Sequence, residues 1–220
     1  MAVTSKPYKG LPMEGIIASW YAKNTGNDVR GTRKLASSIV DNLKPGARVL
    51  EVAPGPGYLA IEIAKMGDYR VAGLDISHSF VRIATENARK ASVSVDFRHG
   101  DAAHMPFPEE SFDFVVCRAA FKNFSDPVGA INEIYRVLGD GGRASIIDLR
   151  KDASLADIDE EVAGMHLSAL NAMLTKWTFR NMLLKSAYTR EAMEAMVSES
   201  RFGKGEILKD GIGFELRLVK

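Results

Sequence analysis

The sequence predicts an α/β protein with a Rossmann-like, doubly wound sheet of seven strands, mostly parallel, that includes an antiparallel C-terminal strand and a helical lid insertion. Short apolar stretches between residues 47 and 149 alternate with segments whose apolar residues have helical spacing, as in right-handed strand–helix–strand crossovers. Residues 49–57 form an apolar strand that ends in an acid and continues into a glycine-rich turn. After residue 150 the alternation stops, and a hairpin signal lies near the C-terminus.

Composition limits the function classes. The chain has 220 residues, 46% of them hydrophobic and 26% charged, which fits one soluble globular domain. Lys and Arg number 29 against 28 Asp and Glu, and no dense basic block occurs, so we expect neither nucleic acid nor an anionic membrane as a partner. The single cysteine excludes an internal disulfide. The sequence has no apolar run of about 18 residues and therefore predicts no membrane-spanning helix. Residues 1–11 lack the apolar stretch of a secretory signal. We expect a cytoplasmic protein.

The expected elements begin with an irregular N-terminal cap segment at residues 1–28, which carries an apolar and aromatic cluster. A core of strands and helices follows at residues 29–150, and its first helix spans residues 29–43 before a Lys-Pro-Gly turn. Five strands are expected at residues 47–52, 69–74, 93–98, 112–116 and 143–149. The continuous apolar character of residues 47–52 is typical of a parallel strand that is covered on both faces.

Helices connect most of these strands. One follows the glycine-rich turn, and Ser77 caps a second that extends to about residue 91. Asp126 and Pro127 begin a third helix, because a capping acid followed by proline is typical of a first turn. Residues 139–142 contain three glycines and are expected to end that helix in a surface turn. Residues 99–110 are expected to form a loop.

The C-terminal third has a different pattern. Residues 151–188 predict a helical insertion of one or two helices with a wide apolar stripe. Residues 189–220 predict a short helix at about 190–198 and two strands, 202–209 and 214–220, joined by an Asp-Gly-Ile-Gly hairpin turn. We expect all these parts to form a single domain, residues 1–220.

The glycine-rich turn indicates a ligand. In doubly wound sheets, ligands bind beyond the carboxyl ends of the strands. Gly55 and Gly57 lack a Cβ atom, so they can adopt a positive φ and leave room for a ligand at the following helix N-terminus. The segment therefore predicts binding of a nucleotide-type cofactor.

The choice of cofactor depends on nearby acids. Residues 55–60 satisfy the dinucleotide-binding pattern, with Asp75 near the distance expected for a ribose ligand. However, Glu51 at the strand end would crowd a pyrophosphate, whereas it suits a ligand with an ammonium group. Asp101 supplies a second acid at the ligand edge, and no Tyr-x-x-x-Lys pair follows the fourth strand. An NAD-type oxidoreductase therefore remains only as an alternative.

Several motifs, which follow one another along the core, support a different interpretation of the cofactor. From about residue 44 to 150 the chain resembles the class I S-adenosylmethionine-dependent methyltransferases, through Glu-Val-Ala-Pro-Gly-Pro-Gly at 51–57, Leu-Asp-Ile-Ser at 74–77 and Gly-Asp-Ala at 100–102. Residues 111–116 and 133–142 resemble later signatures of the branch that acts on small molecules. Phe-Lys-Asn-Phe-Ser-Asp at 121–126 is similar to a stretch of quinone-biosynthesis C-methyltransferases.

The resemblance implies binding of S-adenosyl-L-methionine, with S-adenosyl-L-homocysteine as product, by residues 29–150. Glu51 would orient the ammonium group, and Asp75 would accept hydrogen bonds from both ribose hydroxyls. The other implied cofactor contacts are Ile76 on one adenine face, Asp101 and Ala102 at the adenine amino group, Gly55 and Gly57 along the methionine part, and the backbone of Cys117 and Arg118 near the sulfonium. Glu51 and Asp75 could instead be helix-cap or turn acids, and Asp101 could be a turn former.

Three further residues carry expectations. Ala53 stands where the family has its first glycine, and we expect a negative φ there, with altered turn geometry. Tyr21 either closes over the cofactor or, with its neighbour Trp20, anchors the N-terminal segment. His166 is the candidate base, although a helix histidine without a catalytic role is the simpler interpretation. No cluster has metal-ligand spacing, so no metal is expected.

The implied reaction is in-line methyl transfer to an O-, C- or N-nucleophile of a small molecule. Apolar residues of the insertion suggest a pocket for an apolar or aromatic acceptor, although they could equally form the insertion's own core or an oligomer contact: Met165, Met173, Trp177, Phe179 and Met182. A catalytically silent S-adenosylmethionine-binding protein is a second alternative. The sequence leaves the oligomeric state and the acceptor open.

Overall fold

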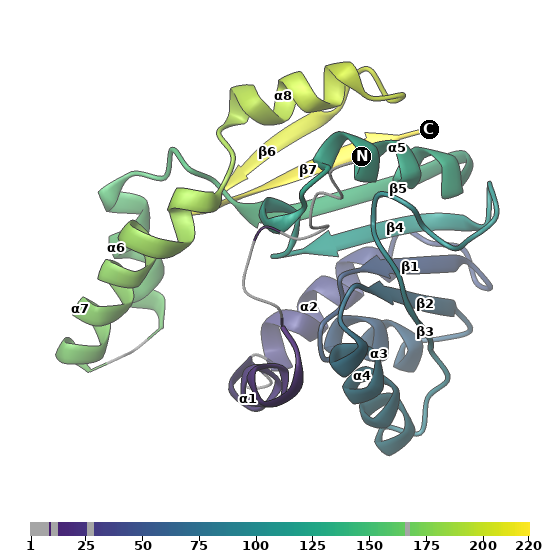
Figure 1. Cartoon of the computed structure of the whole chain (residues 1–220), viewed down its shortest axis with the longest axis horizontal. Coiled ribbons are helices and arrows are strands. Elements are labelled where there is room, and N and C mark those ends of the chain that lie inside the picture. Colours follow the sequence, from purple (N-terminus) through teal and green to yellow (C-terminus); the bar gives the residue numbers. More distant parts are fainter. Residues whose placement is uncertain (1–8, 10–12, 26–28, 166–167) are drawn as a thin grey trace, which may run out of the picture.

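A computed structural model describes residues 9, 13–25, 29–165 and 168–220, and it contains one seven-stranded sheet (Figure 1). Across the sheet the strands are β3 (Asp96–His99), β2 (Arg70–Asp75), β1 (Arg48–Val52), β4 (Phe112–Arg118), β5 (Leu138–Leu149), β7 (Gly213–Val219) and β6 (Glu206–Asp210). Strands β1 to β5 pair in parallel, and β7 is antiparallel to both of its neighbours. The predicted fold class is confirmed.

Helices cover both faces of the sheet because neighbouring strand residues point to opposite sides. Val49 packs with α2 (Val29–Val40) and α3 (Tyr58–Lys65), and α4 (His78–Lys90) lies beside α3 on this face. Leu50 packs on the other face with α5 (Pro127–Val137) and α8 (Arg190–Glu199). The side chains of Ser77 and Asp126 cap α4 and α5 as predicted, accepting hydrogen bonds from the amides of Phe80 and Gly129.

Two parts of the core differ from the sequence prediction. The segment at residues 139–142 is not a surface turn: α5 ends at Val137 and β5 begins at Leu138, whose Cα pairs with Phe112 before the register shifts. This pairing with β4 overrides the turn preference of the glycines. The strands expected at residues 93–98 and 202–209 begin later, at Asp96 and Glu206.

The N-terminal segment is not irregular in its described part. Residues 15–25 form helix α1 (Gly15–Thr25), which packs on α4 through buried Ala18 and Ala22. The Tyr58 hydroxyl donates to the carbonyl oxygen of Ala22 at 2.7 Å. The low contrast between the faces of this helix explains why its apolar cluster carried no clear helical period in the sequence.

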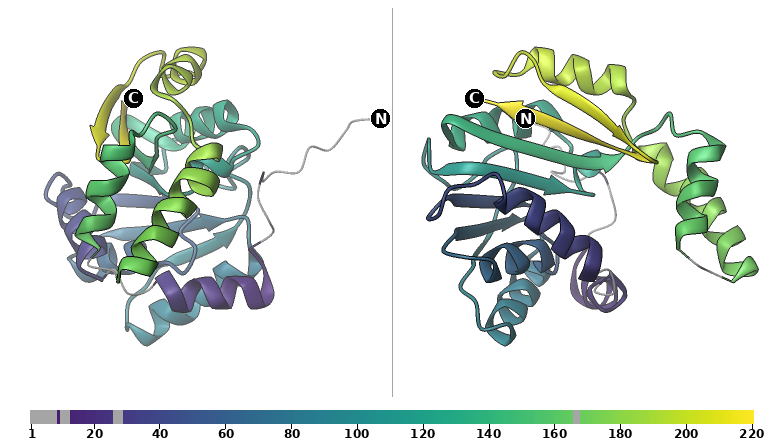
Figure 2. Two further views of the ribbon diagram at one scale, coloured as in Figure 1. Left: turned by 90° about the vertical axis from the view of Figure 1, so that its left-hand side faces the viewer. Right: turned by 180° about the vertical axis from the view of Figure 1, so that it is seen from behind.

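The insertion forms an arm beyond the carboxyl ends of the strands (Figure 2). It consists of α6 (Leu155–Gly164), α7 (Ala169–Thr178), a π turn η2 (Phe179–Leu183) and a 3-10 turn η3 (Leu184–Ser186). Its root is held by buried Arg150, which donates to the carbonyl oxygen of Gly211 at 3.0 Å and contacts Asp152 and Asp157. None of the described helices is long and apolar enough to cross a lipid bilayer.

Candidate cofactor site

The site is built where β1, β2 and β4 end side by side. Glu51 lies in register with Gly73 of β2 and Val116 of β4. The residues that follow these strands therefore meet at one edge of the sheet. This arrangement brings together the glycine-rich turn, Asp75, and the pair Cys117 and Arg118, as the sequence predicted for parallel strands.

The glycine-rich turn has left-handed backbone at Gly55 (φ 54°) and Gly57 (φ 81°). A Cβ atom at Gly57 would lie 2.6 Å from the Phe97 ring and 2.9 Å from the Ala84 methyl group, so space as well as φ requires glycine there. At Gly55 a Cβ atom would meet nothing within 4 Å, and only the backbone conformation favours glycine. The turn therefore leaves open space beside its backbone at Gly55.

Ala53 contradicts our expectation of a negative φ, because its φ is 56°. Its amide donates to the carbonyl oxygen of Leu74 at 2.7 Å, which ties the turn to β2. The left-handed conformation of a residue with a Cβ atom costs roughly 1–2 kcal/mol. The turn thus keeps the geometry typical of glycine, although this chain has alanine at position 53.

Asp75 is buried and clamps the turn. Its carboxylate accepts hydrogen bonds from the amide of Gly55 at 3.0 Å and from the amide of Ser77 at 2.9 Å. Burial raises the pKa of Asp75, and these two bonds oppose the rise. Each oxygen retains a further lone pair. The carboxylate can therefore accept two more hydrogen bonds from a ligand.

Glu51 is also buried, and its carboxylate accepts a hydrogen bond from the amide of Ala60 in the first turn of α3, at 2.8 Å. Burial raises the pKa of Glu51 to about 8, although the Ala60 bond and the charge of Arg118 oppose the rise. In the absence of a ligand this group is therefore mostly protonated at neutral pH. A cation that arrives beside it would restore the charged form.

Residues at the carboxyl ends of β2 and β3 form the neighbouring part of this edge. The ring nitrogen Nε2 of His99 lies 3.0 Å from the carbonyl oxygen of Ile76. The His78 and His99 rings are stacked with centroids 3.6 Å apart. His99 ends β3 and His78 follows the neighbouring strand β2, so their positions in the sequence could have indicated this contact.

Asp101 is a turn former in this structure. Its side chain accepts a hydrogen bond from the amide of Ala103 at 3.0 Å, and its backbone forms a bridge with His104. Ala102 is half-buried against the core of the sheet. The geometry thus matches the alternative that the sequence left open for Asp101, and the side chain is still partly exposed at the ligand edge.

Cys117 and Arg118 differ in environment. Cys117 is fully buried in the core, and burial raises the pKa of its thiol far above the usual range, so it is no nucleophile. An Arg118 guanidinium nitrogen lies 3.3 Å from the Thr32 hydroxyl of α2. The rings of Tyr21 and Phe80 of α4 meet edge to face with centroids 5.8 Å apart, and both roles suggested for Tyr21 stay predictions.

Sequence reasoning missed a buried ion pair beside the site. Lys122 lies in η1 (Phe121–Asn123), and its Nζ atom contacts Asp148 at 2.8 Å and the carbonyl oxygen of Ala119 at 2.9 Å. The exposed fractions of the two side chains are 9% and 1%. Ala119 has a φ of 58°. The pair therefore fixes the backbone that follows β4, and an acid within the apolar run of β5 was its only sequence signal.

These geometric features agree with comparison to known proteins. Residues 50–146 match the family model described as the methyltransferase domain. This segment is similar to methyltransferase domains. The chain is 35% identical over 126 residues to the demethylmenaquinone methyltransferase of Deinococcus radiodurans, a match that covers 57% of this chain and 52% of that protein. It is 34% identical to the 2-phytyl-1,4-naphtoquinone methyltransferase of Synechococcus elongatus, over 50% of this chain and 49% of that protein.

The match spans about half the length of these curated relatives. A solved structure from Methanococcus maripaludis, assigned to the S-adenosyl-L-methionine-dependent methyltransferases, superimposes with a TM-score of 0.76. It covers 100% of this chain and 97% of that one at 22% identity, and so shows the shared fold.

The insertion lies outside the matched segment, residues 50–146, and its apolar residues divide into two groups. Phe179 packs into a small core with Ile158 and Val162 of α6, whereas Met165, Met173 and Trp177 are exposed. His166 and the side chain of Met182 lie outside the described residues, so their proposed roles stay predictions.

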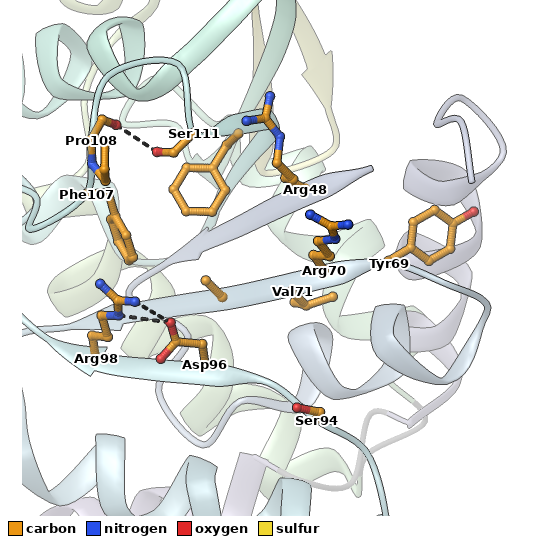
Figure 3. Close-up of a pocket in the computed structure, with 12 residues that line it drawn as sticks. Arg48, Tyr69, Arg70, Val71, Ser94, Asp96, Arg98, Phe107, Pro108 and Ser111 are labelled. Atoms are coloured by element: carbon orange, nitrogen blue, oxygen red, sulfur yellow. Dashed lines mark hydrogen bonds and ion pairs between the residues drawn. The ribbon is translucent and has the colours of Figure 1, made fainter. Parts of the chain in front are cut away.

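The domain also has a hollow of about 530 Å³ far from the cofactor site (Figure 3). It lies at the amino ends of β1, β2 and β3, where the connection from β3 to β4 contains no helix. Two of its arginines are already engaged: Arg48 with Asp113, and Arg98 with Asp96. Among the described residues, no three His, Cys, Asp or Glu side chains are placed to hold a metal ion.

Proposed function

We propose that this chain is an S-adenosyl-L-methionine-dependent methyltransferase that acts on a small apolar or aromatic acceptor. The observation that carries the proposal is the pair of buried carboxylates at adjacent strand ends, Glu51 and Asp75, on either side of a turn with positive φ at Gly55. The match of residues 50–146 to the methyltransferase domain supports it.

The residues present fit this cofactor. Asp75 has two lone pairs directed away from its amide donors, which suits two adjacent ribose hydroxyls. Glu51 is a buried acid with a raised pKa, and an ammonium group is a ligand that would stabilise its charged form. The open space at Gly55 allows close approach to the backbone. The roles of Ile76, Asp101, Ala102, Cys117, Arg118 and Tyr21 remain proposals of the same kind.

When bound, the cofactor supplies an electrophilic methyl group on a sulfonium. The chain then has to hold the acceptor in line with that methyl group, and positioning of this kind can supply up to ~7–11 kcal/mol of the barrier. The backbone after β4 is the nearest rigid support, because Lys122 and Asp148 fix Ala119 and its neighbours. The base that a phenol or an acidic carbon would need stays unassigned, with His166 as the sequence candidate.

The relatives favour a quinone-like acceptor. Two similar proteins are named as methyltransferases of demethylmenaquinone and of 2-phytyl-1,4-naphthoquinone. Residues 121–126 carry the corresponding resemblance, and Phe121 and Phe124 place aromatic rings in the core next to the site. We propose the cytoplasm as compartment, as the sequence suggested, since the single thiol is a reduced core residue.

Calorimetry with three ligands tests the proposal. We expect S-adenosylmethionine and S-adenosylhomocysteine to bind and NADH not to bind. Asp75→Asn should weaken binding by roughly 10–100-fold, because hydrogen bonds to a charged group contribute about 1.5–3 kcal/mol. Asp96→Asn is the matched control, since Asp96 is exposed, is paired with Arg98 and begins β3, at the amino ends of the strands.

The outcomes separate the alternatives. Binding of NADH in place of the sulfur compounds would make the chain an oxidoreductase. Binding of S-adenosylmethionine without methyl transfer to a panel of phenols, quinols and reduced naphthoquinones would favour a silent binding protein. Equal affinity of the Asp75→Asn and Asp96→Asn proteins for S-adenosylmethionine would show that Asp75 does not bind the cofactor.

A further inference from the structure

The arm exposes a continuous apolar stripe on α7. Leu170, Met173, Leu174 and Trp177 occupy positions i, i+3, i+4 and i+7 and therefore share one face of the helix. Their exposed fractions are 71%, 65%, 59% and 56%. An exposed stripe of this size usually marks an interaction surface.

The stripe lies on the side of α7 that faces away from α6. Ala172 and Phe179, seven residues apart, point into the small core that α6 forms with Ile158 and Val162. The stripe occupies the face of α7 opposite Ala172, and Phe179 begins the η2 turn that directly follows α7. The arm's own core therefore cannot cover it.

The charge around the stripe selects one kind of partner. From residue 162 to 190 the chain has no acid and four bases, Lys176, Arg180, Lys185 and Arg190, while the whole chain has a net charge of only +1. Lys176 pairs with Asp159 of α6 at 2.5 Å and Arg190 pairs with Glu194 of α8 at 2.8 Å, whereas Arg180 and Lys185 lie exposed at the end of the arm. A second copy would place bases against bases, whereas an anionic surface would attract them.

Apart from Asp159, which pairs with Lys176, the acids of α6 lie at a hollow beside the hairpin turn. Glu160 and Glu161 of α6 line a hollow with Asp210 and Gly211 of the hairpin turn. A second apolar helix, α1, lies on the same side of the molecule as the arm, with Ile16 and Trp20 exposed and no acid in its sequence (Figure 2). The acidic and apolar surfaces are thus separated.

We infer that α7, assisted by α1, docks on an anionic lipid surface. A helix with an apolar face containing Trp and Leu, flanked by Lys and Arg, lies in the interface plane with its apolar face in the acyl boundary. Basic side chains near such a surface are attracted by its negative potential. This surface departs from the expectation based on composition, because charges balanced over the whole chain are unbalanced locally. The docking is independent of methyl transfer.

The two tryptophans, Trp20 and Trp177, report on the two helices separately. Trp20→Phe leaves Trp177 as the only probe, and Trp177→Phe leaves Trp20. Each protein is mixed with vesicles of phosphatidylcholine alone or with phosphatidylglycerol, without cofactor or acceptor. We expect a blue shift of Trp177 emission and quenching by brominated lipids with the anionic vesicles, and a weaker effect at high salt.

Matched leucine variants test the stripe. Leu174→Gln should reduce vesicle affinity roughly tenfold, given the value of burying one leucine. Leu155→Gln should not, although Leu155 on α6 is equally exposed at 59%. Circular dichroism confirms the fold of each variant. If Trp177 emission does not change on addition of anionic vesicles, the inference is overturned. It is also overturned if the emission shifts to the blue with increasing protein concentration in the absence of lipid, because α7 then contacts a second copy of the chain.

Discussion

At the scale of single residues, the acids of the site were predictable and the backbone at Ala53 was not. An acid at the end of a buried strand is readable because it interrupts an apolar run, as at Glu51 and Asp75. Ala53 has a φ of 56° because Leu74 and the clamped turn fix its position. A tertiary constraint of this kind overrides the local preference of alanine, and the glycine that the resembled family has at this position was its only sequence signal.

Glu51 gives the clearest pH dependence. Its pKa rises from 4.5 to about 8 on folding, chiefly through burial. Between these values Glu51 loses its proton in the unfolded chain and keeps it in the folded protein. The contribution of Glu51 to the free energy of unfolding is therefore fully present below pH 4.5 and decreases as the pH rises to about 8. The slope contributed by this one group is at most about 1.4 kcal/mol per pH unit. Urea unfolding of the wild type and of Glu51→Gln across this range measures it.

The difference between the two proteins isolates Glu51, because Asp75 also has a raised pKa and is present in both. A constant difference across the range would contradict the assignment. The same proton gives a second readout: a ligand ammonium group should ionise Glu51 and release a proton. Calorimetry near neutral pH in buffers of different ionisation enthalpy should therefore show proton release for the wild type and none for Glu51→Gln.

At the scale of elements, the sequence predicted the strands through their apolar runs and missed what holds their ends. Lys122 belongs to a short 3-10 turn, and its partner Asp148 lies 26 residues further along the chain. Only the parallel pairing of β4 and β5 brings them together. In the same way, the pairing of Leu138 with Phe112 extends β5 into a segment whose glycines predict a turn.

The buried pair predicts an asymmetric mutational effect. Lys122→Met should reduce the free energy of unfolding by about 3–5 kcal/mol, because it leaves the Asp148 charge buried without its partner. The double variant Lys122→Met, Asp148→Asn should recover part of this loss. Breaking the exposed pair Arg190 and Glu194 on α8 should cost less than about 1 kcal/mol. Urea unfolding of the wild type and of the three variants tests this prediction. Similar losses of unfolding free energy on breaking the buried pair and the exposed pair would refute it.

At the scale of the whole molecule, the alternation of strands and helices made the sheet predictable, and the arm was predicted only as an apolar insertion. The same apolar residues could line a pocket, form a core or meet a partner, and composition does not separate these cases. Phe179 belongs to a core, while Trp177, two residues before it, is exposed. That division follows from how α7 packs on α6.

The arm should unfold independently of the sheet. Helix α7 has no buried residue, and the arm's core contains four buried side chains, Ile158, Val162, Leu184 and Ile212. By contrast, α5 buries four residues in the main core of the sheet. Segments with few buried contacts open at lower free energy than the global unfolding. Native-state hydrogen exchange should therefore show the amides of α7 exchanging roughly 100-fold faster or more than those of α5.

Lipid should change this exchange in one place. If α7 docks on an anionic surface, vesicles containing phosphatidylglycerol should slow exchange in α7 and leave α5 and β4 unchanged, because the apolar stripe gains a cover and the core does not. Equal protection of α7 and α5 without vesicles would show that the arm is part of the main cooperative unit. Slower exchange throughout the molecule would indicate general stabilisation in place of local docking.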